Sequence, residues 1–73
     1  MEFYDRMENI RKFYGETQKE IADVLGISYQ QYGLYESGKR YIPVDLLRAF
    51  CLHYGVSSDY ILGMPEGMKY PNL

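Results

Sequence analysis

The chain has 73 residues, 47% of them hydrophobic, which is ordinary for one globular domain with a small core. No apolar run approaches the roughly 20 residues that cross a bilayer, and the start lacks a signal-peptide pattern. The single cysteine, Cys51, excludes an intrachain disulfide. We therefore expect a cytoplasmic protein. Eight lysines and arginines oppose ten aspartates and glutamates, giving a formal net charge of −2, whereas nucleic-acid-binding domains are usually basic.

Apolar residues recur at helical spacing over residues 2–14. Phe3, Met7, Ile10 and Tyr14 stand at positions i, i+4, i+7 and i+11, which share one face of a helix. A glycine follows directly and predicts the end of this first helix. We expect the four side chains to face the core.

A second helix is predicted next. Thr17 and Glu20, three residues apart, are the signature of a capping box, which places the helix start at Gln18. Gly26 suits the left-handed conformation that often follows a last helical turn. The expected apolar face comprises Ile21, Ala22 and Leu25.

A third helix is predicted directly after that turn. Ser28 and Gln31 are a second capping-box signature at its start, and Ser37-Gly38 ends it. The expected inward-facing pair is Tyr32 and Tyr35. Two short helices joined by a tight glycine turn present the second helix outward, and in small proteins such a helix most often enters the DNA major groove.

Two further helices are expected after a loop over residues 39–42. Pro43 suits the first turn of a fourth helix, which Gly55 ends. Ser57 is expected to cap a short fifth helix over residues 58–62. The side chains expected in the core are Leu47, Phe50, Cys51, Tyr54, Ile61 and Leu62.

The remaining chain carries no helical or strand-like pattern. Residues 64–73 contain two prolines and one glycine, so we expect a flexible or partner-bound tail after a domain over residues 1–63. Since no segment alternates as a strand does, the predicted fold class is all-α.

A series of short markers follows in a fixed order along the chain. The markers are Thr17-Gln18, Ile21-Ala22, Leu25-Gly26-Ile27-Ser28, Tyr35-Glu36-x-Gly38-Lys39, Pro43, Gly55-Val56-Ser57 and Asp59-Tyr60-Ile61-Leu62-Gly63. The series covers Met7 to Gly63 and resembles the Cro/C1-type helix-turn-helix family of lambda-repressor-like domains, a group of transcriptional regulators. The resemblance implies a compact five-helix domain that binds double-stranded DNA without a cofactor.

The resemblance also implies a role for particular residues. The base-facing positions are Ser28, Tyr29, Gln30, Gly33 and Leu34, of which Gln30 is suited to bond N6 and N7 of adenine. The expected phosphate contacts are Gln18, Lys19, Lys39 and Arg40. A structural ion pair is expected between Arg11 and Glu36.

The expected function is a transcriptional repressor of bacterial or phage origin. It would bind a near-palindromic operator as a homodimer, because one small domain covers only about half of such a site. Leu52 and Tyr60, together with the apolar tail, are a candidate dimer surface. Repression would follow from exclusion of polymerase.

An alternative remains open beside the regulator. Family members often carry basic or long polar side chains where Tyr29 and Leu34 stand, and the net charge is acidic. These features also suit a protein-interaction module or an antitoxin-like partner with weak DNA binding. An enzyme is not expected, since the sequence shows no paired nucleophile and base and no metal-ligand constellation around its single histidine, His53.

Overall fold

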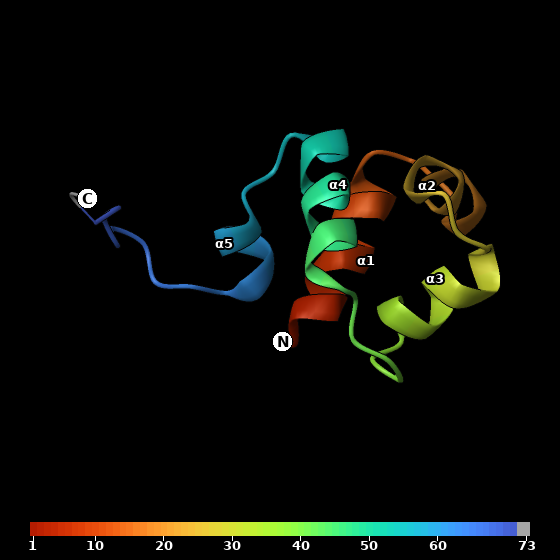
Figure 1. Cartoon of the computed structure of the whole chain (residues 1–73), viewed down its shortest axis with the longest axis horizontal. Helices are drawn as coiled ribbons and strands as arrows, with labels where there is room; N and C mark the ends of the chain where they lie inside the picture. The colour runs from red at the N-terminus through yellow and green to blue at the C-terminus, as the bar shows by residue number, and fades with distance from the viewer. Residues whose placement is uncertain (72–73) are drawn as a thin grey trace.

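The computed structural model describes residues 1–71, and within them five helices and no strands occur (Figure 1). The helices are α1 (Phe3–Phe13), α2 (Gln18–Leu25), α3 (Tyr29–Glu36), α4 (Val44–Tyr54) and α5 (Ser58–Leu62). The all-α prediction is therefore confirmed. The last two residues of the predicted tail lie outside the described range.

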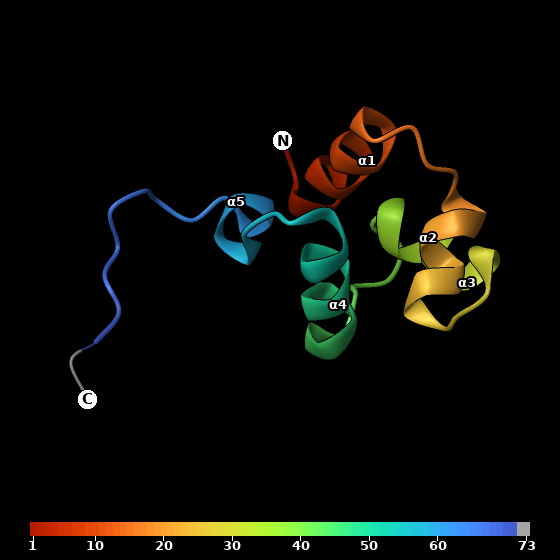
Figure 2. The same cartoon turned by 90° about the horizontal axis from the view of Figure 1, so that it is seen from above.

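The helices are arranged around α1 and α4, which occupy the middle of the molecule. Helices α2 and α3 pack against each other on one side, and α5 lies on the other side, from which the tail runs away from the domain (Figures 1 and 2). Helix α1 contacts both α3 and α5, and α4 contacts both α2 and α5. The central pair thus joins the two ends of the fold.

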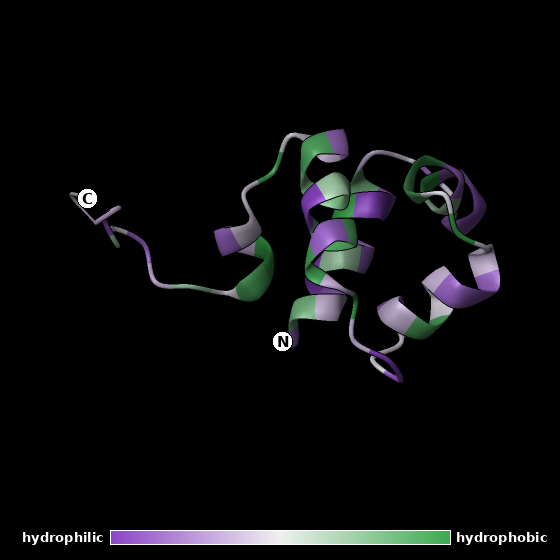
Figure 3. Ribbon diagram, in the orientation of Figure 1, coloured by the Kyte–Doolittle hydropathy of each residue, from purple (hydrophilic) through white to green (hydrophobic). Residues whose placement is uncertain are grey.

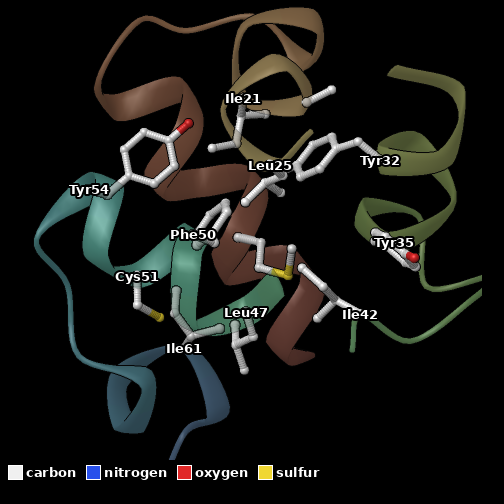
Figure 4. Close-up of a cluster of buried hydrophobic side chains, with 12 residues drawn as sticks. Ile21, Leu25, Tyr32, Tyr35, Ile42, Leu47, Phe50, Cys51, Tyr54 and Ile61 are labelled. Carbon is white, nitrogen blue, oxygen red and sulfur yellow. The ribbon is translucent and has the colours of Figure 1, made fainter. Parts of the chain in front are cut away.

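The core lies where these helices meet, and Figure 4 shows its side chains pointing toward one another. The buried apolar residues are Met7, Ile21, Ala22, Leu25, Tyr32, Tyr35, Ile42, Leu47, Phe50, Cys51, Tyr54 and Ile61. The inward roles predicted for Tyr32, Tyr35 and Cys51 are confirmed. Ile42 joins them from the loop after α3 and fastens that loop to the core.

The connection between α2 and α3 follows from local sequence. Thr17 and Glu20 form both hydrogen bonds of the predicted capping box. At the other end of α2, Gly26 has φ of 73°, and the amide of Ile27 donates to the carbonyl of Ala22 at 3.0 Å. These bonds close the last turn of α2 and reverse the chain into α3. Ala22 is fully buried, in agreement with the expected apolar face of α2.

Several details of the sequence prediction are wrong. Leu62, expected in the core, is 46% exposed. Tyr14, expected on the inner face of α1, is 52% exposed because it follows the end of the helix; there its ring stacks on that of Tyr54. Pro43 is the N-cap of α4 rather than a residue of its first turn. The second capping box is only half formed, as shown by the contacts of Gln31.

The Gln31 side chain turns away from the start of α3. Its backbone amide donates to Ser28 Oγ at 3.1 Å, which is the first bond of the predicted box. Its carboxamide instead donates to the hydroxyl of Tyr35 at 2.9 Å, one turn further along the helix. Because the Gln31 carboxamide is bonded to the buried Tyr35, it does not form the second hydrogen bond of the capping box, which would join it to the backbone amide of Ser28.

Candidate nucleic-acid interface

Helix α3 has one buried side and one open side. Tyr32, Tyr35 and Glu36 are buried against the other helices. The residues predicted to face DNA lie on the rest of the helix: Ser28, Tyr29 and Gln30 are exposed, and Gly33 and Leu34 are half-buried. The structure therefore brings the predicted base-facing residues together on the accessible side of α3.

A buried ion pair ties α3 to α1. The guanidinium of Arg11 donates two hydrogen bonds to Glu36, from Nε to Oε2 at 2.9 Å and from Nη2 to Oε1 at 2.8 Å. A third bond runs from Arg11 Nη1 to the carbonyl of Glu16 at 2.7 Å. One arginine thus connects α1, the loop before α2 and the end of α3.

Gln18 belongs to the same network. Its carboxamide nitrogen donates to Glu36 Oε1 at 3.2 Å. Its oxygen lies beside Gly33, 3.5 Å from where a Cβ would stand at that position. The first residue of α2 is half-buried and therefore braces α3, a role that the sequence did not predict.

Lys19 and Asp23 form an exposed ion pair along α2, with Lys19 Nζ 3.0 Å from Asp23 Oδ2. The ammonium of Lys19 is therefore partly compensated in the free protein. Within residues 1–71, neither Lys39 nor Arg40 has a carboxylate at ion-pair distance. Of the predicted phosphate contacts, these two carry the uncompensated charge.

The loop that carries Lys39 and Arg40 is held by two contacts near the end of α3. The amide of Arg40 donates to the carbonyl of Leu34 at 3.2 Å, which folds the loop against the end of α3. Gly38 has φ of 78° and lies directly under the ring of Tyr4, where a side chain would overlap the ring. Sequence reasoning missed this role of Tyr4, because the contact joins residues 34 positions apart and no local motif marks it.

Charge near α3 is more positive than the sequence total suggests. Between Val24 and Val44 the only acidic residue is Glu36, and it is buried and paired with Arg11. The exposed charges of this stretch are therefore those of Lys39 and Arg40, in the strongly hydrophilic loop that Figure 3 colours purple.

The carboxylate of Glu36 is stabilised in its charged form. Burial by itself raises the pKa of Glu36, but hydrogen bonds from Arg11 and Gln18 outweigh burial and hold the pKa below its usual value. The group therefore stays ionised at neutral pH, and the ion pair persists.

Glu16 points to α4. Its Oε1 lies 2.9 Å from His53 Nε2, and this hydrogen bond is the largest cause that lowers the pKa of Glu16. His53 is exposed and fastens the loop before α2 to the end of α4.

The two residues of the predicted dimer surface lie in different hollows. Leu52 is 65% exposed and lines a groove between α4 and α5. Tyr60 is 52% exposed and lines a second hollow with Arg6 and the start of the tail. The two hollows share no lining residue.

None of the helices in residues 1–71 has the length and apolarity needed to span a bilayer. In the same range, no three histidine, cysteine, aspartate or glutamate side chains are grouped so that they could hold a metal ion.

Two short helices joined by a left-handed glycine, with the second helix open on one side and anchored on the other, define a helix-turn-helix domain of DNA-binding proteins. The helix-turn-helix family model matches residues 8–61, and the chain belongs to this family. The predicted resemblance to Cro/C1-type regulators is confirmed. Members of this group are DNA-binding regulators rather than enzymes.

Curated relatives carry names that agree with this class. The chain is 34% identical over 64 residues to the uncharacterized HTH-type transcriptional regulator YobD of Bacillus subtilis, covering 88% of this chain and 57% of that protein. It is 38% identical over 64 residues to the HTH-type transcriptional regulator ImmR of the same species, covering 88% and 50%. It is 33% identical over 63 residues to the cryptic phage CTXphi transcriptional repressor RstR of Vibrio cholerae, covering 86% and 56%. The chain thus spans about half the length of these relatives.

Proposed function

We propose that this protein is a sequence-specific transcriptional regulator that inserts α3 into the major groove of double-stranded DNA. The observation that carries the proposal is the division of α3 into an anchored inner side and an open outer side. The inner side is fixed by Arg11, Gln18 and the core tyrosines, so the outer side is presented in one orientation. A fixed orientation is what base readout requires, because each contact depends on the position of a base edge.

Base recognition is assigned to the outer side of α3. Gln30 is exposed near the N-terminus of the helix and carries the carboxamide that pairs with N6 and N7 of adenine. Leu34 suits contact with a thymine methyl group, and Gly33 leaves room for the DNA to approach the backbone. Ser28 and Tyr29 complete the proposed set at the helix start.

Phosphate contacts set the register of α3 on the duplex. Lys39 and Arg40 are the main candidates, because the loop that carries them is exposed and fastened to the end of α3. Lys19 adds a contact if its ammonium exchanges Asp23 for a phosphate. At the start of α2, Gln18 is the fourth proposed phosphate contact, and the backbone amides there attract anions at a helix N-terminus.

Assembly as a homodimer on a near-palindromic operator completes the proposal. A two-fold symmetric pair presents two copies of α3 about one helical turn, roughly 34 Å, apart. Repression is supported by the relative RstR, which is named as a transcriptional repressor. We propose that repression acts by exclusion of polymerase. The bacterial and phage relatives support a cytoplasmic location in a bacterium.

A second candidate function is a protein-binding module or an antitoxin-like partner. The observation that favours it is the apolar character of two residues on the open side of α3. Tyr29 is 52% exposed and Leu34 is half-buried, and aromatic and aliphatic side chains suit a protein interface as well as DNA. The two functions differ in their dependence on nucleotide sequence and on salt.

Selection of bound duplexes from a random pool tests the regulator directly. We expect enrichment of a two-fold symmetric site, followed by a steep fall in affinity for that site as salt is raised from about 50 to 200 mM. A pool that shows no enriched sequence after repeated rounds would reject the regulator. Binding to a protein partner with little salt dependence would then support the module.

A further inference from the structure

An apolar groove lies between α4 and α5, on a part of the domain that the proposed DNA contacts do not use. It encloses about 480 Å³. Val44 and Leu52 of α4 and Leu62 of α5 line it and are largely exposed, and Arg48 lies among them. The groove therefore combines an apolar floor with one basic side chain.

The tail carries side chains of complementary chemistry. Met64, Met68 and Tyr70 are exposed, with Tyr70 at 98%. Glu66 stands between the methionines and supplies a carboxylate. The three apolar side chains match the apolar lining of the groove, and Glu66 matches Arg48, while Lys69 stands between Met68 and Tyr70.

The exit of the tail from α5 directs it away from its own groove. Gly63 has φ of 71°, and the amide of Met64 donates to the carbonyl of Asp59 at 2.9 Å, which fixes the chain direction after the helix. Residues 64–68 then line the hollow beside Arg6 and Tyr60, which shares no residue with the groove. Both views show the tail running outward from the domain (Figures 1 and 2).

The tail is long enough to reach another copy. Residues 64–71 span roughly 25 Å when extended. The groove follows α4 from Val44 to Leu52, a length of roughly 12 Å along the helix. One tail can therefore cross from its own α5 to the α4 of a neighbour and still fill the groove there.

We propose that the α4–α5 groove binds the tail of a second copy of this chain, with Glu66 of one copy paired to Arg48 of the other. A two-fold axis makes the exchange reciprocal, so each groove is filled and each charge pair occurs twice. The inference rests on the homodimer proposed above and names the segments that form it. It also assigns Leu52 to the interface and leaves Tyr60 outside it.

Sedimentation velocity on the full chain and its variants tests this exchange. Removal of residues 65–73 and the substitution Leu52→Glu should each raise the dimer dissociation constant at least about tenfold. Leu52 is exposed, so its substitution leaves the core intact, and circular dichroism checks the fold. The truncated chain should still bind a duplex that holds one half-site, which separates failure of the dimer from failure of DNA binding.

Charge reversal tests whether Arg48 of one copy pairs with Glu66 of the other. Arg48→Glu and Glu66→Arg should each weaken the dimer about tenfold, because two attractive pairs become repulsive. The double variant should return to within about threefold of the unmodified chain. Lys12→Glu, at an exposed lysine of α1 that lines neither hollow, is the control and should not be rescued by Glu66→Arg.

Three results would overturn the proposal. A chain that stays monomeric at roughly 0.1 mM forms no exchanged dimer. A truncated chain that dimerises as strongly as the full chain does not use its tail. A double charge variant that dimerises no more tightly than either single variant shows that Arg48 and Glu66 do not form a pair across the dimer.

Discussion

Arg11 of α1 holds Glu36, the last residue of α3, through two hydrogen bonds of 2.9 and 2.8 Å, and both side chains are buried. This bidentate pair joins residues 25 positions apart and fixes the end of α3 relative to α1. The orientation of the proposed DNA-reading helix therefore depends on an ion pair that touches no DNA.

Removal of one partner of this pair should be costly. Arg11→Met leaves the Glu36 carboxylate buried without its main partner, and we expect a loss of about 3–5 kcal/mol in the free energy of unfolding. Urea denaturation followed by circular dichroism measures the change. The control is Lys12→Met, whose lysine is exposed and 3.7 Å from Glu8, and whose loss should cost less than about 1 kcal/mol. Equal costs for the two variants would contradict a structural role for Arg11.

Stability should fall on acidification because of the same pair. The pKa of Glu36 is lower in the folded protein than its usual value of 4.5. A depressed folded pKa means that the stabilisation is complete above about pH 4.5 and is lost as the pH falls through the folded pKa. Urea denaturation between pH 7 and pH 3 measures this loss, and Glu36→Gln should give a flatter profile. Parallel profiles for both proteins would place the acid sensitivity elsewhere.

Substitution by alanine should change the stability of the domain in opposite directions at two glycines near α3. Gly33 lies inside the helix, and a Cβ there would make an ordinary 3.5 Å contact with Gln18, so Gly33→Ala should stabilise the domain by about 0.5–1 kcal/mol. Gly38 has a left-handed backbone and lies under Tyr4, so Gly38→Ala should destabilise it by more than about 1 kcal/mol. Thermal denaturation measures both. A neutral Gly38→Ala would show that Tyr4 does not hold the loop.

Arg40 should contribute affinity without sequence preference. Arg40→Ala should weaken binding to selected and random duplexes by the same factor and reduce the slope of log affinity against log salt by about one per copy. Fluorescence anisotropy at several salt concentrations measures both quantities. Lys12→Ala, on the exposed side of α1, is the control and should leave the slope unchanged. A loss confined to the selected duplex would instead assign Arg40 to base readout.

The sequence predicted the helices well because their ends are encoded locally. Thr17, Ser28 and Ser57 each cap the helix that follows, and Gly26, Gly55 and Gly63 each adopt the left-handed conformation after a helix. Such signals act within a few residues, so they can be read without the fold. The inner and outer sides of α3 also follow from helical spacing.

Contacts between distant residues were harder to predict. The hydrogen bond from Gln18 to Glu36 was not predicted, and the phosphate contact expected of Gln18 stays a prediction. No local pattern marked the contact between Glu16 and His53 of α4 either. Each partner lies 18 or more positions away, and a side chain with several possible partners reveals its choice only in the folded domain.

Base reading by α3 is the central claim, and site selection with Gln30→Ala tests it most directly. Selection from one random pool with the unmodified chain, Gln30→Ala and Gln31→Ala compares two glutamines of the same helix, of which Gln30 is exposed and Gln31 is half-buried. We expect Gln30→Ala to keep the two-fold site but to lose preference at one base pair in each half, a discrimination of about 1–3 kcal/mol. Gln31→Ala should select the same site as the unmodified chain. Identical sites and affinities for all three proteins would contradict the assignment of α3 as the helix that reads DNA.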